Sequence, residues 1–240
     1  MEGKFAYVVR YCHAYTVRKP PRKVFMPDKP QARRPRNSLT VPAILDAAEA
    51  VASAGMDSLT IRAVADQLGC SPMGLYRYVA GKEDLVEALL DRVLGRMPTL
   101  PESSDPLADL GAFATAHRDL LLAHPWAVSG LIAHPSPGPN ALPIGEQALG
   151  LLHRLGVEGD RAVATFSGII ALNYGWVSFA IASRSTAAAP SLQRIASGPA
   201  DGFPRTVAVG EAMARFGSED HYATVVAELL EGLAALGARP

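Results

Sequence analysis

The stretch of sequence that decides the fold is Thr60–Lys82, TIRAVADQLGCSPMGLYRYVAGK. Its first half carries apolar residues at the i, i+3, i+4 and i+7 positions that form one face of a helix: Ile61, Val64, Ala65 and Leu68. Thr60 is a favourable N-cap for this helix, and Gly69 supplies the left-handed conformation that ends it. These residues therefore predict a short helix over residues 61–68, followed by a tight turn.

A second, shorter helix is predicted after the turn. Ser71 is a favourable N-cap, and Pro72 stands at the first helical position, where its missing N–H group is no loss. Leu75 and Val79 are expected to point inward, which leaves three larger side chains on the other faces: Tyr76, Arg77 and Tyr78. A small inner helix, a glycine turn and an outer helix with polar and aromatic side chains predict a helix-turn-helix, whose second helix enters the major groove of DNA.

Two flanking helices complete a predicted module over residues 39–97. Thr40 caps the first helix, Gly55 ends it, and its buried face is expected to hold Ile44, Ala47, Ala48 and Val51. The second begins at Gly81-Lys82-Glu83-Asp84, where two acidic residues favour the start of a helix. Its apolar face is expected to continue to Pro98 through Leu85, Leu89, Val93 and Met97.

Beyond a linker at Pro98–Pro106, the sequence predicts a second helical domain over residues 98–240. Its expected helices span residues 107–124, 126–134, 141–155, 160–183 and 204–216, followed by a last helix capped by Ser218. Apolar residues nearly encircle the 160–183 helix, which predicts burial on more than one side. Residues 184–203 are expected to form a mobile loop, and no segment predicts a strand, so the expected fold class is all-α.

Composition excludes several classes of protein. The 240 residues are 49% hydrophobic, enough for one large or two small cores. No uncharged apolar run predicts a membrane span, and the basic N-terminus lacks the apolar segment of a secretory signal. Cys12 and Cys70 are the only cysteines, which argues against a disulfide scaffold or a cysteine zinc site and indicates a reducing cytoplasm.

The zero net charge of the chain hides a basic arm on an acidic body. Residues 1–38 carry ten lysines and arginines against Glu2 and Asp28, a net charge of +8, so the rest of the chain carries −8. The prolines and the lack of a helical pattern predict a disordered arm. Three interpretations remain open: a solvated tail, a segment that precedes a true start at Met26, or an arm that contacts DNA phosphates through Arg33, Arg34 and Arg36.

The four predicted N-terminal helices together resemble the DNA-binding domain of the tetracycline-repressor (TetR) family of bacterial transcriptional regulators. The resemblance is carried by the AA pair and AG turn of the first helix, by LTIRAVADQLG and by LYRYVAGKEDL, and it covers residues 39–94. HPWAV, the GPNAL loop and the final HYATVVAELLEGL resemble the family's ligand-binding domain. The resemblance implies a homodimer that a small molecule releases from operator DNA, with a repressor more usual than an activator.

The resemblance also implies a set of DNA-contacting residues. Arg62 matches an arginine that reaches DNA, and Tyr76 and Lys82 match contacts to backbone phosphate. Lys82 lies at a helix N-terminus, where free N–H groups attract an anion, and Arg77 has the geometry to pair with guanine. The full set is Arg62, Ser71, Pro72, Met73, Gly74, Tyr76, Arg77, Tyr78 and Lys82. As alternatives, Tyr78 packs against the fourth helix, and Arg62 pairs with Asp66 on its own helix.

In the family, the C-terminal helices enclose a small-molecule pocket. The residues expected to line it here are Phe113, His117, Trp126, Leu131, Phe166, Ile170, Asn173, Tyr174, Trp176 and Phe179. His117 and Asn173 are the expected polar members, because a buried amide or imidazole needs a partner; the alternative is that these residues are ordinary core. Met97-Pro98-Thr99 lacks the histidine of the tetracycline repressor, so tetracycline is not the expected effector, and the histidine spacing predicts no metal and no cofactor.

The last helix is expected to supply the dimer interface, together with the outer side of the 160–183 helix, through Val226, Leu229, Leu230 and Leu233. The alternative is that this stripe packs only within one chain. Ligand binding is expected to tilt the helix before Pro98 and to spread the two reading helices. An architectural DNA-binding protein and an enzyme that uses the C-terminal cavity are the other functions considered. The acidic body opposes the first, and no catalytic motif supports the second.

Overall fold

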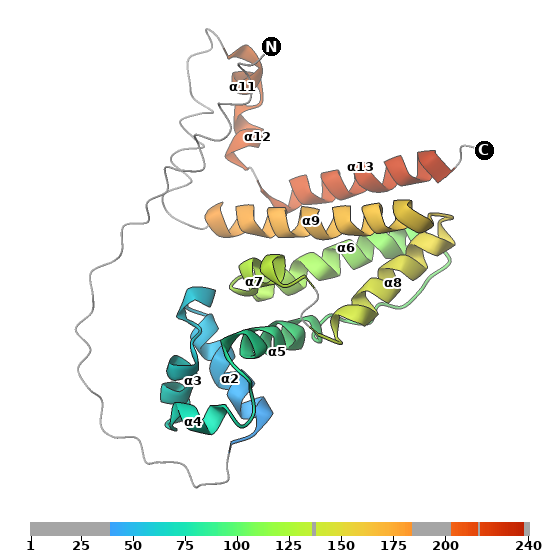
Figure 1. Ribbon diagram of the computed structural model, residues 1–240. Helices are drawn as coiled ribbons and strands as arrows, with labels where there is room; N and C mark the ends of the chain where they lie inside the picture. The colour runs from blue at the N-terminus through green and yellow to red at the C-terminus, as the bar shows by residue number, and fades with distance from the viewer. Residues whose placement is uncertain (1–38, 136–137, 184–202, 216, 238–240) are drawn as a thin grey trace, which may run out of the picture. The chain divides into compact units, whose positions relative to one another are not determined.

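The computed structural model describes residues 39–135, 138–183, 203–215 and 217–237, and within these ranges every element is a helix, as predicted (Figure 1). The first elements are α2 (Val41–Ala52), the 3-10 turn η1 (Met56–Ser58), α3 (Ile61–Leu68), α4 (Pro72–Leu75) and α5 (Lys82–Leu94). The later elements are α6 (Pro106–Ala123), α7 (Ala127–Ala133), α8 (Ala141–Arg154), α9 (Gly159–Ser183), α11 (Pro204–Ala208), α12 (Gly210–Ala214) and α13 (Glu219–Gly237).

The caps predicted for α2 and α3 are present, because each helix begins after a threonine whose hydroxyl oxygen accepts a first-turn N–H. Thr40 accepts from the Ala43 amide at 3.3 Å, and Thr60 accepts from the Ala63 amide at 3.0 Å. Gly69 ends α3 with φ 66°, the left-handed conformation that glycine adopts without strain. Gly55 does not end α2 as predicted. It lies three residues beyond the helix and opens η1.

The second helix of the helix-turn-helix is shorter than predicted. α4 ends at Leu75, and the next residues continue as a turn in which the Tyr78 and Val79 amides both donate to the Leu75 carbonyl, at 2.8 and 3.1 Å. Leu75 and Val79 are nevertheless both buried, as the spacing predicts. Ser71 precedes α4, but its side chain makes no capping hydrogen bond. Packing of the inward pair therefore holds this segment in place.

The helix that leaves the module, α5, also ends earlier than predicted. Leu85, Leu89 and Val93 are fully buried along its inner face. The helix stops at Leu94, so Met97 lies in the turn that follows and is only half-buried. At its other end the Asp84 carboxylate accepts a hydrogen bond from the Ala80 amide at 2.7 Å, which fixes the chain as it enters the helix.

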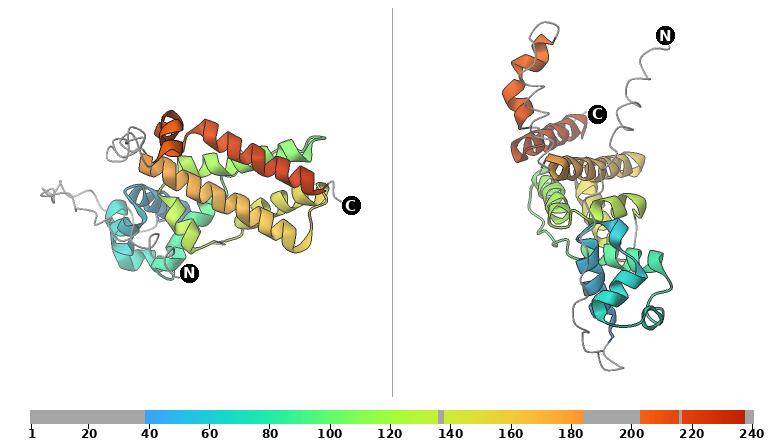
Figure 2. Two further views of the ribbon diagram at one scale, coloured as in Figure 1. Left: turned by 90° about the horizontal axis from the view of Figure 1, so that it is seen from above. Right: turned by 90° about the vertical axis from the view of Figure 1, so that its left-hand side faces the viewer.

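The C-terminal domain is organised around α6. This helix packs against α8, α9 and α13, while α7 packs against both α5 and α9 (Figures 1 and 2). The fully buried apolar residues of α6 include Leu110, Phe113 and Leu121. Asp105 caps α6 by accepting from the Leu107 and Ala108 amides, both at 3.0 Å. The domain that is expected to hold an effector thus contacts the reading module through α7 and α8.

The sequence predicted no segment able to span a membrane, and α9 differs from that expectation. Gly159–Ala182 is long and apolar enough to cross a bilayer, with a mean hydropathy of 1.3, yet only 17% of it is buried. Core helices of soluble proteins share this length and hydropathy. The predicted burial on several sides is likewise incomplete, since Val163, Phe179 and Ile181 are exposed. Among the described residues, much of the apolar surface of α9 is therefore left exposed.

The helix expected over residues 204–216 is divided into α11 and α12 at Val209. The last helix begins as predicted after Ser218, whose hydroxyl oxygen accepts from the His221 amide at 3.4 Å. The expectations for the arm at residues 1–38 and for residues 184–202 of the predicted loop lie outside the described residues.

Candidate nucleic-acid interface

The reading segment, which we define as residues 71–78, presents most of its side chains to solvent. Met73 is 74% exposed and Tyr76 is 50% exposed, whereas Leu75 is completely buried between them. The other predicted contacts that are exposed are Arg62, Ser71, Pro72, Arg77, Tyr78 and Lys82, and Gly74 is half-buried. The predicted DNA contacts are therefore accessible to solvent, apart from the half-buried Gly74. Those in the reading segment are held in place by the buried Leu75.

Tyr78 has a partner that the sequence did not predict. Its hydroxyl donates a hydrogen bond to the carbonyl oxygen of Leu39 at 2.8 Å, and Leu39 is the residue from which the chain enters α2. The Arg77 guanidinium lies 6.0 Å from the centre of the Tyr78 ring, at the outer limit of a cation–π contact. A hydrogen bond from a side chain to the backbone thus joins the reading segment to Leu39, which lies 39 residues earlier in the sequence.

Two predicted DNA contacts lie outside the reading segment, Arg62 and Lys82, and both are only weakly held by other residues. Arg62 lies 4.0 Å from Asp66, with 86% and 72% of the two side chains exposed. Such a pair is worth roughly 0.2–1 kcal/mol, which is too little to keep Arg62 from a phosphate. Lys82 is exposed at the first position of α5, and the N-cap residue before it, Gly81, provides no capping side chain. Both residues are available for a phosphate contact.

Ion pairs fasten α2 to the far end of α5. Arg92 bonds Asp46 at 2.5 Å, and Arg96 grips Glu49 through two nitrogen–oxygen contacts of 2.6 Å each. The hydrogen bonds from Arg96 are the main reason that the pKa of Glu49 lies below its usual range. These ion pairs hold α2 against the C-terminal end of α5 and the turn that follows it.

His124 connects the C-terminal domain to these ion pairs through Arg96. Its Nε2 atom lies 2.5 Å from Arg96 Nη1, and its Nδ1 atom lies 2.9 Å from the Leu120 carbonyl. Arginine can only donate, so Nε2 accepts and Nδ1 carries the hydrogen toward the carbonyl. The junction between α6 and α7 therefore touches the same arginine that holds α2.

A second connection joins α5 to the start of α8. The Asp91 carboxylate accepts from the Asn140 backbone amide and from its side-chain amide, at 2.8 Å each. Gly95 permits this approach, because a Cβ atom there would lie 2.9 Å from Asn140 Nδ2. The C-terminal domain therefore holds α5 at two places, neither of which the sequence analysis identified.

The two polar residues predicted for the effector pocket are buried and bonded to each other. Asn173 Nδ2 lies 3.0 Å from His117 Nδ1 and 2.9 Å from the Ala114 carbonyl. The Tyr222 hydroxyl lies 2.7 Å from Asn173 Oδ1 and 2.9 Å from the same carbonyl. Because the amide nitrogen donates, His117 Nδ1 accepts. This cluster joins α6, α9 and α13, and Tyr222 is a member that the sequence analysis missed.

Burial decides the protonation of this cluster. Burial lowers the pKa of His117 to about 4 and raises the pKa of Tyr222 to about 12, so both are neutral near pH 7. Arg118 lies 4.2 Å from the centre of the Tyr222 ring and pairs with Glu219 at 2.8 Å, which adds a cation–π contact between α6 and α13. The aromatic surroundings of His117 are two rings predicted to line the pocket, Phe113 and Tyr174.

The other predicted pocket residues differ in burial. Phe113 and Leu131 are fully buried, Phe179 is exposed, and four residues are half-buried: Phe166, Ile170, Tyr174 and Trp176. Trp126, also half-buried, lines a hollow of about 310 Å³ with Met56, Ile132 and Ile181. The described part of the chain thus brings Phe113, His117, Asn173, Tyr174 and Trp176 together around one buried polar cluster.

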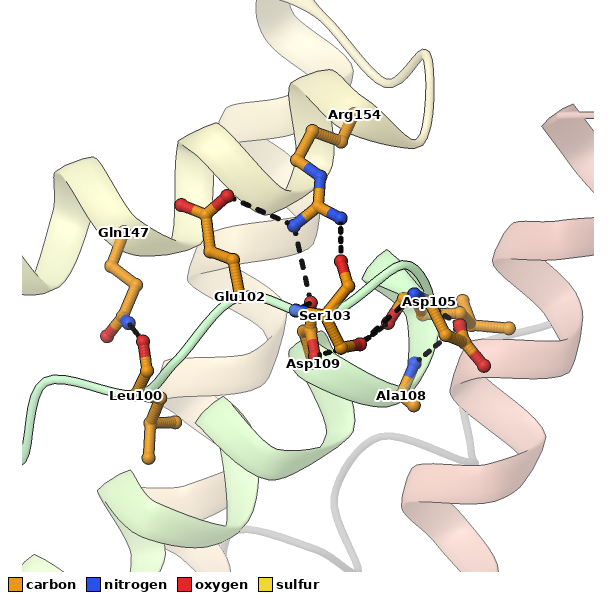
Figure 3. Close-up of polar contacts among 9 residues, drawn as sticks. Leu100, Glu102, Ser103, Asp105, Ala108, Asp109, Gln147 and Arg154 are labelled. Atoms are coloured by element: carbon orange, nitrogen blue, oxygen red, sulfur yellow. Dashed lines mark hydrogen bonds and ion pairs between the residues drawn. The ribbon is translucent and has the colours of Figure 1, made fainter.

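A larger hollow, of about 610 Å³, lies where α5 ends and the linker passes α8. Apolar residues such as Met97, Pro98 and Ile144 line it together with the polar Gln147. Figure 3 shows how its linker wall is held: Gln147 donates to the Leu100 carbonyl at 3.1 Å, and Arg154 reaches several linker oxygens. The partners of Arg154 are Glu102 and Asp109, at 3.2 Å each, and the Ser103 carbonyl.

The four residues predicted for the dimer interface are engaged with the chain's own core. Val226 and Leu233 are buried, and Leu229 and Leu230 are half-buried. Leu230 lies so close to α6 that a Cβ atom on Gly111 would be 3.0 Å from its Cδ1. The stripe therefore packs at least partly within the chain, and the small and apolar residues exposed on α9 are more accessible: Val163, Ala164, Gly168 and Ala171.

Comparison with known proteins places this architecture in a family. The model "Bacterial regulatory proteins, tetR family" matches residues 44–89, and "Tetracyclin repressor-like, C-terminal domain" matches residues 98–236. The HTH-type transcriptional repressor DrrR1 of Streptomyces coeruleorubidus is 34% identical over 143 residues, 55% of this chain and 50% of that protein. An HTH-type transcriptional regulator of Saccharopolyspora erythraea is 35% identical over 153 residues, 62% of this chain and 63% of that protein.

The chain thus spans between half and two thirds of the length of these curated relatives. Among solved structures, apo ActR of Streptomyces coelicolor superposes with a TM-score of 0.74 at 23% identity, covering 83% of this chain and 96% of that one. ActR in complex with actinorhodin gives 0.76 at 23% identity, covering 85% and 99%. At 23% identity the structural similarity to ActR shows a shared fold. The two family models, which match residues 44–89 and 98–236, show that the chain is also related to the family by sequence. The chain belongs to the TetR family of bacterial transcriptional regulators.

Proposed function

We propose that this regulator is a repressor, acting as a homodimer that binds a palindromic operator and that a small, largely apolar effector releases. The observation that carries the proposal is the geometry of the reading segment. Met73, Tyr76 and Arg77 are exposed on a segment that the buried pair Leu75 and Val79 fixes to the module. Of the similar proteins, DrrR1 is described as a repressor, which favours that role over activation.

Base reading is expected to rest on few side chains. Arg77 is the exposed side chain of the reading segment that can form a bidentate pair with guanine, a contact worth roughly 1–3 kcal/mol of discrimination. Met73 offers apolar contact, for instance to a thymine methyl group. Tyr76, Arg62 and Lys82 surround this centre with exposed groups suited to phosphates, which set the register without reading sequence.

Dimerisation is expected to use the uncovered face of α9 with the outer side of α13. The apolar stretch Gly159–Ala182 is only 17% buried in the single chain, and a soluble protein rarely leaves so long an apolar helix in water. Ala164, Gly168 and Ala171 are exposed on α9, and small residues allow a partner helix to approach closely. A two-fold pairing would present two reading segments to two half-sites, as a palindromic operator requires.

Effector binding is expected in the C-terminal domain beside His117 and Asn173. Aromatic rings surround these residues, and apolar walls with a few polar groups are the usual form of a small-molecule site. An effector with a hydrogen-bonding group would compete for the bond between Asn173 and His117. Because that bond joins α6 to α9, its exchange would shift the two helices and the α6–α7 junction at His124.

The route from this junction to DNA follows the contacts of Arg96. His124 and Glu49 both bond Arg96, so a shift of the junction acts on α2 as well as on the exit of α5. We therefore expect α2 to move together with the tilting α5, so that the two reading helices spread. An effector can drive this movement only to the extent that it binds the released conformation more tightly.

Selection of genomic DNA fragments, followed by transcription in vitro, tests the proposal. The purified full chain is incubated with sheared genomic DNA at 150 mM salt, and the bound fragments are sequenced. A recovered palindrome, with transcription from the adjacent promoter falling when the protein is added, would support a repressor. Transcription that rises on addition of the protein would overturn the repressor role. Recovery of DNA without a common sequence would overturn operator recognition itself.

A further inference from the structure

We infer that the hollow between the end of α5, the linker and α8 is a second small-molecule site, and that it takes an amphipathic cation, an amine with an apolar body. This inference goes beyond the proposed effector site, because other elements line the hollow. The cluster of His117, Asn173 and Tyr222 joins α6, α9 and α13, and none of these helices contributes to the described lining of the hollow.

One wall of the hollow is a single face of α8. Pro143, Glu146, Gln147 and Gly150 follow the i, i+3, i+4, i+7 spacing of a helix face, and all four line the hollow. The buried Ile144 adds apolar surface beside them. The volume of about 610 Å³ lies within the range of small-molecule sites, roughly 300–1,000 Å³. The hollow is therefore large enough for a drug-sized molecule.

The opposite wall is formed by the chain that leaves α5. Leu94, Met97, Pro98 and Leu100 give this wall an apolar surface, and Leu94 is buried. The wall is held in place from α8, because Gln147 donates to the Leu100 carbonyl at 3.1 Å (Figure 3). A site whose walls are fixed before the ligand arrives loses little conformational freedom on binding, which favours affinity.

The charged groups of the hollow favour a cation. Its charged lining residues are Glu102 and Glu146, and the described lining contains no lysine, arginine or histidine. Glu102 is already paired with Arg154 at 3.2 Å. Glu146 is exposed, and among the described residues it has no hydrogen-bond or ion-pair partner. An ammonium group on the ligand would therefore find an unpaired carboxylate at the edge of an apolar space.

The uncharged polar groups of the hollow suit the same ligand. An ammonium group has three hydrogens to donate and no lone pair to accept with, so it needs oxygen acceptors. Gln147 uses its side-chain nitrogen for the linker, which leaves its side-chain oxygen as an acceptor. The Thr99 hydroxyl on the opposite wall can also accept. Both walls thus offer an acceptor in addition to the Glu146 carboxylate.

The position of the hollow gives its occupant a contact with both domains. Leu94 is the last residue of α5, and Asn140 precedes the first residue of α8. Both line the hollow, and the Asn140 amide donates to Asp91 of α5 at 2.8 Å. A bound amine would therefore bridge α5 and α8 beside a hydrogen bond that already joins them.

Calorimetric titration with three matched compounds tests the ligand class. The compounds 4-phenylbutylamine, 4-phenylbutanol and 4-phenylbutyrate have similar apolar bodies and are cationic, neutral and anionic near pH 7. The purified full chain should bind the amine, should bind the alcohol about 2- to 5-fold more weakly, and should bind the carboxylate more weakly still. No binding of the amine, or equal affinity for the amine and the alcohol, would overturn the inference.

Gly150→Leu tests the location of the site. A Cβ atom at Gly150 would meet nothing within 4 Å, so the new side chain extends into the hollow without a clash. It should displace two or three methylene groups of the ligand and lower amine affinity by about 15- to 60-fold. Gly145→Leu is the matched control, because Gly145 lies on the same helix with equally open surroundings but does not line the hollow. Retained affinity in Gly150→Leu, or an equal loss in the control, would place the amine elsewhere and overturn the assignment.

Glu146→Gln tests the carboxylate without filling the hollow. Affinity for the amine should fall by about 2- to 5-fold, and affinity for the alcohol should stay the same. Glu211→Gln, exposed on α12 and outside the hollow, should change neither affinity. Unchanged amine binding in Glu146→Gln would overturn the role of this carboxylate in selecting a cation.

The titrations are carried out without DNA, so they do not depend on the proposed operator binding. Failure to select an operator would leave the amine site standing, and failure to bind the amine would leave the proposed regulator standing. Circular dichroism of each variant checks that its helices are retained. Because Glu146→Gln keeps the size of the side chain, it tests the site even if Gly150→Leu loses its fold.

Discussion

Arg96 and Glu49 form a two-pronged ion pair in which both terminal nitrogens of the arginine bond the two carboxylate oxygens, at 2.6 Å each. Arg96 follows the last residue of α5 by two positions, and Glu49 lies on α2. His124 adds a third bond to the same guanidinium from the C-terminal domain. The DNA-reading module and the expected effector domain therefore both bond this arginine, in addition to the contact between Asp91 and Asn140.

Glu49→Gln should lower stability at neutral pH by about 1–3 kcal/mol, the usual range for a hydrogen bond to a charged group. The folded-state pKa of Glu49 lies below 4.5, chiefly because of the bonds from Arg96. The contribution of the pair is therefore present above pH 4.5 and is lost as the pH falls through the lower, folded-state pKa. Urea unfolding from pH 3 to pH 7 should show the difference between the two proteins shrinking in acid.

Asp220→Asn is the matched control for that experiment, because Asp220 pairs with Arg215 at 3.7 Å with both side chains largely exposed. Such a pair should contribute little at any pH. A Glu49→Gln effect no larger than the control, or one independent of pH, would contradict the role given to the pair.

Asn173→Ala should destabilise the C-terminal domain by about 1–3 kcal/mol for each buried group left without its partner. The change removes the donor to His117 Nδ1 and one of the two acceptors near the Tyr222 hydroxyl, which keeps the Ala114 carbonyl at 2.9 Å. Ser178→Ala is its control, since Ser178 is exposed on the same helix and its hydroxyl donates to the Tyr174 carbonyl four residues earlier. Chemical denaturation measures both variants. Equal stability of the two would show that the buried cluster contributes nothing.

His117 should make stability depend on pH in mildly acid solution. Its pKa is lowered by burial from 6.5 to about 4, so between these values the unfolded chain binds the extra proton. Stability is therefore full above pH 6.5 and falls as the pH drops toward 4, by at most about 3.4 kcal/mol at 1.36 kcal/mol per pKa unit. His117→Gln, which keeps a neutral polar side chain, should flatten this part of the curve. An unchanged slope would place the titration elsewhere.

Arg77→Ala and Lys82→Ala should weaken operator binding in different ways. Loss of Arg77 should cost roughly 1–3 kcal/mol on the best site and relax specificity at one base pair per half-site. Loss of Lys82 should weaken binding to all sequences and lower the salt slope by about one. Anisotropy on a panel of operators, each with one base pair changed, distinguishes the two. If Arg77→Ala weakened every sequence equally, its contact would be to phosphate.

Local patterns predicted the reading module well, because its determinants are close together in sequence. The caps at Thr40 and Thr60, the left-handed Gly69 and the buried pair Leu75 and Val79 all depend on spacings of a few residues. The length of α4 was wrong, because the chain leaves the α-helical pattern after Leu75 without a change in the apolar spacing. A turn and a helix can bury the same two residues.

Contacts across long separations were not predictable in this way. Tyr78 and Leu39 are 39 residues apart, Arg96 and Glu49 are 47 apart, and Tyr222 and Ala114 are 108 apart. The same limit affected the stripe on α13, because periodicity shows that residues share a face but not which surface covers it. Val226 and Leu233 are buried in the chain's own core, whereas Val163, Phe179 and Ile181 of α9, the other helix expected at the interface, are exposed among the described residues.

The most direct test of the account is a hydroxyl-radical footprint on the selected operator, combined with the mass of the complex in solution. Two subunits should bind each operator and protect two patches about 34–36 Å apart, related by two-fold symmetry. Ala171→Arg, on the exposed face of α9, should abolish both the dimer and the paired footprint while leaving the helical content unchanged. One subunit protecting a single patch on the operator would contradict the proposal that two copies of this chain read a palindrome.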